Sequence, residues 1–577
     1  MKPHSDNKKA GLLFSTGLLV FALSGCGGGD NAKDGYPIAA DVYTTLQRTV
    51  VPDASPTPAT PIYPYEVSKY QTNGYGTWQY GSSLPAEKRF DLMPDGYANT
   101  AAAVTNVARL LNFFSMTDVH IADKESPAQA IYFGYKGGII SAYSAVMLYT
   151  THVLDAAVQT VNALHKQNPM DFGLSLGDSA NNAQYNELRW YIDVFDGRVI
   201  NPDSGAKDDP VPGPHNDYQD EYQAAGLDKS IPWYQVIGNH DQFWMGSFPI
   251  KPAAGKTVDL RPVYTGTDIL QMGNIFNLGG INERTYYMGV LDGSTLYGDV
   301  IGVGPVASTP EPAKVVADPN RRPVTKKEWM GEFFKTSSNP VGHGFSQANL
   351  EQDFASYSFE PKSNLPLKVI VLDDTQKDDD QSLRGYGHGT LDKTRYEWLV
   401  GELDKGQAEG KLMIIAAHIP IGVEPAGAVL GWWSGAYISE PDLIAKLNTY
   451  PNLILWVAGH RHRNAVKAFK SPDVSRPELG FWQVETSSLR EFPQQFRTFE
   501  IVRNSDNTIS ILATNVDPAV KEGSFAAISR SYAVAAMQLF KASLELSPSG
   551  SYNAELVKQL SPEMQLKIQN YGVPVAR

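Results

Sequence analysis

Five apolar runs in this chain of 577 residues stop abruptly at residues whose side chains bind metals or transfer protons. The run at 233–237 shows this most clearly, because Gly238-Asn239-His240-Asp241 follows it at once. A buried strand that ends in this way holds the backbone of the next loop, and the loop aims the side chains. One such sequence would be weak, since Gly, Asn and Asp are also common turn residues. Five of them favour a fold that brings strand ends together.

The other four apolar runs lie at 110–114, 172–176, 412–416 and 452–457. The residues after them are Asp118 with His120, Asp178, His418, and His460 with His462. Five of the 11 histidines therefore lie at the ends of predicted strands. No role is predicted for the other six, which lie in helix-patterned, polar or Gly-rich sequence: His4, His152, His165, His215, His343 and His388.

Segments of helical periodicity separate several of these runs, and later stretches alternate like antiparallel strands. Alternation of strand and helix predicts parallel βαβ units, whose carboxyl ends meet at one edge of a sheet. The pattern therefore predicts an α/β fold, with Asp392 as the N-cap of one helix. The helical segments are 146–164, 188–195 and 393–403, and the alternating stretches are 480–485, 498–502 and 508–514.

The rest of the chain can be divided into segments by their content of Gly, Pro and periodic apolar residues. Residues 26–106 are predicted to form a tether followed by a Pro-rich segment in extended conformation. The core domain is predicted at 107–515, interrupted at about 243–355 by a large Gly- and Pro-rich insertion with weak periodicity. Residues 516–577 are predicted to form a C-terminal helical extension that carries no motif.

The first 25 residues resemble a bacterial lipoprotein signal peptide. Lys8 and Lys9 precede an apolar run at 10–23 that is short for a permanent membrane span, and Cys26 comes soon after it. The resemblance implies that Cys26 becomes the acylated first residue and anchors the protein to a membrane. Gly27, in place of Asp, favours the outer membrane, with the protein facing the periplasm. The alternative is an ordinary signal peptide with a chance cysteine.

Charge and cysteine content exclude several classes of partner and site. The formal net charge of −13 offers no general field for nucleic acid. Cys26 is the only cysteine, which excludes intrachain disulfides and CxxC metal sites.

The polar strand ends suit a metal site. Asp, Asn and His without Cys favour Mn, Fe or Zn, as divalent or trivalent ions. Two such ions lie about 3.5–4 Å apart when a carboxylate bridges them. The alternations Asp118-x-His120 and His460-x-His462 are predicted to lie on extended segments, which would point both side chains of each pair the same way.

The ordered set of motifs resembles the calcineurin-like metallophosphoesterase superfamily. All five blocks are present in the order of that family, and they span residues 107–515 apart from the insertion. The resemblance implies a sandwich of two mixed β-sheets flanked by helices. The blocks are Asp118-x-His120, Gly177-Asp178-x-x-Asn181, Gly238-Asn239-His240-Asp241, His418 and Gly459-His460-x-His462.

The resemblance also implies a role for each matching residue. Asp118, His120, Asp178 and His462 would hold one metal ion, and Asp178, Asn239, His418 and His460 would hold a second. Asp178 would bridge the two ions, and a metal-bridging hydroxide would attack the phosphorus of a phosphate mono- or diester. His240 would face the phosphorylated small-molecule substrate, with Asp241 orienting its ring. Asn181 would support the site from behind the ligands.

Two other hypotheses for the function stay open on the sequence alone. The same fold would also serve a nucleotide or pyrophosphate-bond hydrolase, and the sequence does not distinguish these substrates. A surface-anchored binding lipoprotein without turnover is disfavoured, because every expected ligand is present. Asp373 and Asp374 end a core strand and could support the site, but a solvated acidic loop is the favoured interpretation. Arg461 and Arg490 could contact phosphate oxygens, but a surface position is favoured for both.

Overall fold

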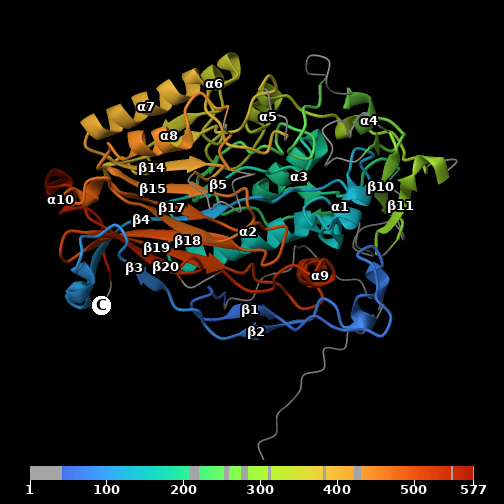
Figure 1. The fold of residues 1–577 in the computed structure, drawn as a ribbon, viewed down its shortest axis with the longest axis horizontal. Coiled ribbons are helices and arrows are strands. Elements are labelled where there is room, and N and C mark those ends of the chain that lie inside the picture. The colour runs from blue at the N-terminus through green and yellow to red at the C-terminus, as the bar shows by residue number, and fades with distance from the viewer. Residues whose placement is uncertain are drawn as a thin grey trace, which may run out of the picture. The chain divides into compact units, whose positions relative to one another are not determined.

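Two mixed β-sheets organise the protein, as a computed structural model shows (Figure 1). The structure describes residues 42–206, 220–251, 259–273, 284–295, 297–308, 313–380, 385–421, 431–433, 435–547 and 550–575. All of these belong to one compact unit, Asp34–Arg577. Cys26 and the predicted signal peptide lie outside the described residues.

The first sheet has six strands in the order β12-β13-β14-β15-β17-β16. Its four central strands run parallel, and β12 and β16 pair antiparallel at the two edges. Parallel strands buried on both faces read as continuous apolar runs, which is why β14 and β15 could be predicted. The stretch at 480–485 was predicted as an antiparallel strand, but β17 pairs parallel with β15 and antiparallel only with β16. The strands are β12 (Tyr357–Phe359), β13 (Leu367–Leu372), β14 (Leu412–Ala417), β15 (Leu453–Ala458), β16 (Ala465–Phe469) and β17 (Phe481–Glu485).

The second sheet has eight strands in the order β3-β20-β19-β18-β4-β5-β8, with β21 pairing with β4. Strands β4, β5 and β8 are parallel, whereas β18 and β19 form the expected antiparallel pair. The strands are β3 (Glu87–Arg89), β4 (Asn106–Met116), β5 (Phe172–Ser175), β8 (Trp233–Gln235), β18 (Phe496–Asn504), β19 (Ile509–Val516), β20 (Ala554–Lys558) and β21 (Val573–Pro574).

The two sheets pack against each other and helices cover them, so the predicted sandwich is confirmed. Alternate residues of the first sheet, such as Val369 and Ile414, share one apolar cluster with Phe113 and Phe499 of the second sheet. The opposite face, with Ile370 and others, packs under α7 (Lys393–Ala408) and α8 (Glu440–Leu447), which lie above β14 and β15 in Figure 1. Helices α2 (Thr150–Gln167) and α3 (Tyr185–Asp196) add side chains to the first cluster.

The predicted insertion is more ordered than its composition suggested. It contains a three-stranded antiparallel sheet, which lies beside α1 (Ile131–Gly137) at one end of the unit (Figure 1). Weak periodicity concealed these elements because they are short. They are α4 (Arg261–Thr265), β9 (Gln271–Met272), β10 (Tyr286–Asp292), β11 (Asp299–Pro305), α5 (Lys326–Glu332) and α6 (Gln347–Gln352).

The ends of the described chain belong to the second sheet. Strand β20 pairs antiparallel with β19, and β3 from the N-terminal segment pairs with β20. The prediction of a purely helical C-terminal extension is therefore wrong for β20, although α9 (Phe525–Leu539) and α10 (Pro562–Ile568) are helices as expected. The remaining short strands are β1 (Thr49–Pro52) with β2 (Trp78–Gly81), and β6 (Val199–Ile200) with β7 (Tyr222–Gln223).

Asp392 caps α7, as predicted, because its side chain accepts a hydrogen bond from the backbone N–H of Arg395. Among the described helices, none is both long enough and apolar enough to cross a membrane.

Candidate metal centre

The predicted ligands meet where the parallel strands of both sheets end. Asp118, Asp178 and Asn239 come after β4, β5 and β8 of the second sheet. His418 and His460 come after β14 and β15 of the first sheet. The centre therefore lies between the carboxyl ends of two packed sheets, and not at the edge of a single sheet.

Five of the predicted ligands have positive φ angles, a conformation rare in residues other than glycine. The prediction of extended Asp-x-His and His-x-His segments is therefore wrong. Such conformations persist where surrounding structure holds them, and they concentrate at functional sites. The angles are 51° at Asp118, 47° at His120, 53° at Asp178, 71° at His460 and 53° at His462.

Two glycines let the loops approach one another closely. A Cβ atom on Gly238 would lie 2.1 Å from Oδ1 of Asp178. A Cβ atom on Gly459 would lie 1.9 Å from Oγ1 of Thr117 and 2.5 Å from Oδ2 of Asp118. Any side chain at either position would displace a predicted ligand.

Asp118, His120 and His462 form the first group of converging donor atoms. The Nε2 atoms of His120 and His462 lie 3.1 Å apart, and Nε2 of His462 lies 3.2 Å from Oδ1 of Asp118. Oδ2 of Asp118 is occupied, since it accepts hydrogen bonds from Thr117 and from the backbone N–H of His460. Oδ1 of Asp118 is buried without a hydrogen bond in the described residues, as expected of an oxygen reserved for a cation.

Asp178, His418 and His460 form the second group, and Asn239 joins it. Oδ1 of Asn239 lies 2.9 Å from Nε2 of His418 and 3.1 Å from Nδ1 of His460. Nδ1 of His418 donates to the carbonyl of Leu176 at 2.7 Å, which leaves Nε2 turned toward the group.

One carboxylate oxygen connects the two groups. Oδ2 of Asp178 lies 3.3 Å from Nε2 of His418 and 3.7 Å from Nε2 of His120. Oxygen and imidazole donors at these separations fit two neighbouring cations that share Asp178, and the absence of sulfur among them agrees with Mn, Fe or Zn.

Burial and mutual charge set the protonation of these groups. Burial and the charge of neighbouring histidines lower the pKa of His120 and of His460 to about 3, so both rings are neutral with a lone pair available. Burial opposes protonation of His418, but the Asp178 carboxylate outweighs it and raises the pKa to about 10. A cation would take the place of the proton on His418, so metal binding is expected to release protons.

His240 forms a third group of converging donor atoms with His120 and Asp178, and its ring lies edge-on to that of His120 at 4.4 Å between centroids. Its Nδ1 donates to the carbonyl of Asn181 at 2.6 Å, so the neutral ring carries its hydrogen there and leaves Nε2 as an acceptor. The prediction that Asp241 orients this ring is wrong, because the backbone of Asn181 does so.

Asp241 instead organises the loop backbone. Its carboxylate accepts hydrogen bonds from the N–H groups of Gly238, Asp178, Ser179 and Ala180 at 2.9–3.2 Å. The loops after β5 and β8 are thereby tied together, which places Asp178 beside Asn239.

Asn181 supports the site through two different groups. Its carbonyl holds His240, while its side chain donates to Gln129 and accepts from Arg490. Sequence patterns assigned no partner to either contact, because Gln129 and Arg490 lie far from Asn181 along the chain.

Several charged residues expected at the surface are buried. Asp373 pairs with Lys326 at 2.7 Å and with Arg395 at 3.3 Å, and Asp374 accepts from the backbone N–H of Ile419, next to His418. Burial raises the pKa of Asp374 to about 7. The predictions of a solvated loop for Asp373 and Asp374 and of a surface position for Arg490 are therefore wrong, because all three residues are buried. The side chain of Arg461 donates to Glu485.

Glu491 was not predicted as a site residue. Its Oε1 lies 3.1 Å from Nδ1 of His462. Only its position after the alternating stretch at 480–485 linked it to the core in the sequence.

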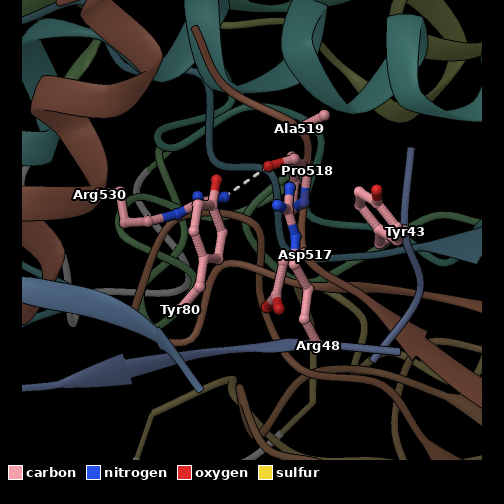
Figure 2. A pocket seen from close by; sticks show the side chains of 7 residues that line it. All are labelled: Tyr43, Arg48, Tyr80, Asp517, Pro518, Ala519 and Arg530. Carbon is pink, nitrogen blue, oxygen red and sulfur yellow. Dashed lines mark hydrogen bonds between the residues drawn. The ribbon is translucent and has the colours of Figure 1, made fainter. Parts of the chain in front are cut away.

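A cavity outside the centre is shown in Figure 2. Its charged groups are already engaged, since Arg530 donates to the carbonyl of Pro518 and Arg48 lies 3.8 Å from the centroid of the Tyr80 ring. Asp517 accepts from Gln495 at 2.7 Å. The cavity is lined by Tyr43, Arg48, Tyr80, Asp517, Pro518, Ala519 and Arg530, none of which was a predicted site residue.

No protein-family model matches the chain, and no curated protein matches it. Among solved structures, the chain is similar to a dimetal phosphatase from Danio rerio, with 11% sequence identity and a TM-score of 0.35. The match covers 71% of this chain and 99% of the other.

Proposed function

We propose that this protein is a metal-dependent phosphoesterase that hydrolyses a phosphate mono- or diester at a two-metal centre. The carrying observation is the position of Asp178, whose Oδ2 faces donor atoms of both groups, His120 on one side and His418 on the other. A shared carboxylate between two His- and Asp-rich groups is the arrangement that two adjacent cations require.

Each predicted ligand would bind one of two metal ions, and Asp178 would bind both. Asp118, His120, Asp178 and His462 would hold one ion, and Asp178, Asn239, His418 and His460 the other. When bound, a pair of cations supplies an acidified water and neutralises charge on phosphoryl oxygens. The loops fix these ligands through backbone contacts, which avoids reorganisation during the reaction.

His240 would act on the substrate and not as a ligand. The Asn181 carbonyl fixes its ring and its tautomer, so Nε2 is the atom available to the substrate. Once protonated at Nε2, the ring would stabilise the transition state or deliver that proton to the leaving oxygen. Asp241 would contribute by holding the loop that carries His240.

Hydrolysis of two matched esters tests the proposal. The purified full-length protein, loaded with manganese, is assayed on a chromogenic phosphate monoester and on the corresponding diester. Turnover of either ester, lost in Asp178→Asn, is the expected result, and the preferred ester identifies the substrate class. A protein that binds no metal and cleaves neither ester would contradict the proposal.

The same proposal includes export and a lipid anchor. The N-terminal sequence supports it through Lys8, Lys9, the apolar run at 10–23 and Cys26. The enzyme would then act on phosphorylated small molecules in the cell envelope, from the periplasmic side of an outer membrane.

A further inference from the structure

Arg490 is a buried arginine with an open hydrogen-bonding edge. Its exposed fraction is 1%. Its Nε and Nη2 atoms are buried and have no hydrogen-bond partner among the described residues. Burying a guanidinium without acceptors is costly, so a group in this state needs an explanation.

The guanidinium of Arg490 lies close to the metal centre. Its Nη1 donates to the side-chain oxygen of Asn181, whose backbone carbonyl holds His240. The backbone N–H of Arg490 donates to Ser488 at 2.9 Å, and Ser488 in turn donates to the carbonyl of Asp118 at 2.7 Å. Arg490 is therefore one residue away from both the predicted proton donor and a predicted ligand.

Two other buried or partly buried arginines, Arg461 and Arg321, have this edge filled, whereas Arg395 has only Asp392 at 3.4 Å from its Nε. Nε of Arg461 donates to Glu485 at 2.7 Å, and its Nη2 donates to the other oxygen of the same carboxylate. Nε of Arg321 lies 3.1 Å from Asp123, and its Nη2 donates to Ser204 at 2.7 Å. The edge made by Nε and Nη2 matches two oxygens of a carboxylate or a phosphate, and in Arg490 the protein supplies neither.

We propose that Arg490 binds two non-bridging oxygens of the substrate phosphoryl group through its Nε and Nη2 edge. The inference rests on the proposed function, since it assigns the phosphoryl group to this centre. Arg490 then places phosphorus between the two metal ligand groups and His240, and it retains inorganic phosphate after hydrolysis.

A competing explanation is that Arg490 acts only through Asn181. Asn181→Ala separates the two, because it removes the contact with Nη1 but keeps the backbone carbonyl that holds His240. Under the proposal, Asn181→Ala weakens phosphate binding less than a change at Arg490 itself does.

Binding of inorganic phosphate to the manganese-loaded full-length protein tests the proposal by titration calorimetry. Arg490→Lys keeps the charge and loses the paired donors, while Arg490→Gln loses both. Each variant is expected to bind phosphate about 10- to 100-fold more weakly, with unchanged metal content, because charge-assisted hydrogen bonds are lost. Arg321→Lys is the control, a buried arginine with filled donors, and is expected to keep wild-type affinity for phosphate.

Equal phosphate affinity in wild type and Arg490→Lys would overturn the proposal, as would an equally large loss in Asn181→Ala. A second measurement uses wild type alone, loaded with diamagnetic zinc in place of manganese: phosphate should shift one arginine Nε–H resonance downfield, and no shift would also overturn the proposal. Phosphate binding that depends on Arg490 in a protein without ester hydrolysis would contradict the proposed function and leave only a phosphate site at Arg490.

Discussion

Oε1 of Glu491 lies 3.1 Å from Nδ1 of His462, on a ring whose Nε2 lies 3.2 Å from Asp118. A carboxylate behind a ligating histidine fixes the ring and makes it a stronger donor. This relationship links the loop after β17 to the first group of donor atoms.

Replacing Glu491 with Gln is expected to weaken binding of one metal ion. Loss of such a supporting carboxylate lowers metal affinity by about 10- to 100-fold. The second ion should be retained, because Asp178, Asn239, His418 and His460 are untouched. Metal titration followed by mass spectrometry of bound ions measures the difference, and equal loss of both ions would show that Glu491 does not act on one group alone.

Asp178→Asn is expected to abolish hydrolysis and to remove at least one ion, because an amide is a poor bridge between two cations. Metal analysis and the ester assay measure both effects. Asp155→Asn is the control, a buried acid on α2 that accepts from Ala225 and Gln159 away from the centre. An Asp178→Asn protein with wild-type rate and metal content would refute the two-metal assignment.

His240→Ala is expected to keep both ions and to slow turnover by about 10²- to 10⁴-fold, the usual contribution of a positioned proton-transfer group. The loss should be largest for esters with poor leaving groups, since these need a proton most. Rates over a series of leaving groups provide the measurement. If the substitution removes metal instead, His240 is a ligand.

His152 predicts an acid sensitivity that is separate from catalysis. Burial lowers its pKa to about 3, and its ring stacks on Tyr222 at 4.2 Å. The unfolded chain binds a proton near pH 6.5 and the folded protein does not, so stability falls as pH drops from 6.5 toward 3. The slope approaches about 1.4 kcal/mol per pH unit.

His152→Phe should make that slope shallower by about 1.4 kcal/mol per pH unit while leaving stability at pH 8 nearly unchanged, because His120 and His460 keep their own contributions. Urea unfolding of both proteins at pH 5 and pH 8 gives the comparison. A variant that loses stability with acid as steeply as wild type would show that His152 is not the responsible group.

Cys26→Ser is expected to release the protein from the membrane fraction and to block incorporation of a labelled fatty acid. The expectation comes from the lipoprotein-like signal, because acyl chains on Cys26 would be the anchor. Fractionation of expressing cells and in-gel detection of the label test it. Labelling that persists in Cys26→Ser would place the modification elsewhere.

The sequence located most of the central strands, because each is an apolar run buried on both faces. Strands β12 and β16 escaped prediction, since both lie at sheet edges and carry mixed burial. Strand β20 was not predicted for a different reason. Its place in the sheet depends on pairing with β19 and with β3, and these pairings cannot be read from the local sequence.

The predicted ligands lie close together in the structure, but the contacts that hold their loops in place could not be predicted. Asp241 was expected at the His240 ring and instead binds four backbone N–H groups. Asp373 looked solvated within an acidic stretch, yet Lys326 from the insertion neutralises it in the interior. These contacts join segments far apart in sequence, and local patterns carry no information about them.

The sequence by itself determined which residues are candidate ligands and that each comes after a buried strand, because strand burial and residue chemistry are local properties. The tertiary structure decided that the ligands come from two sheets, that Asp178 lies between both groups, and that Glu491 and Arg490 flank them. Those relationships arise from packing two sheets face to face, which places loops hundreds of residues apart within hydrogen-bonding distance.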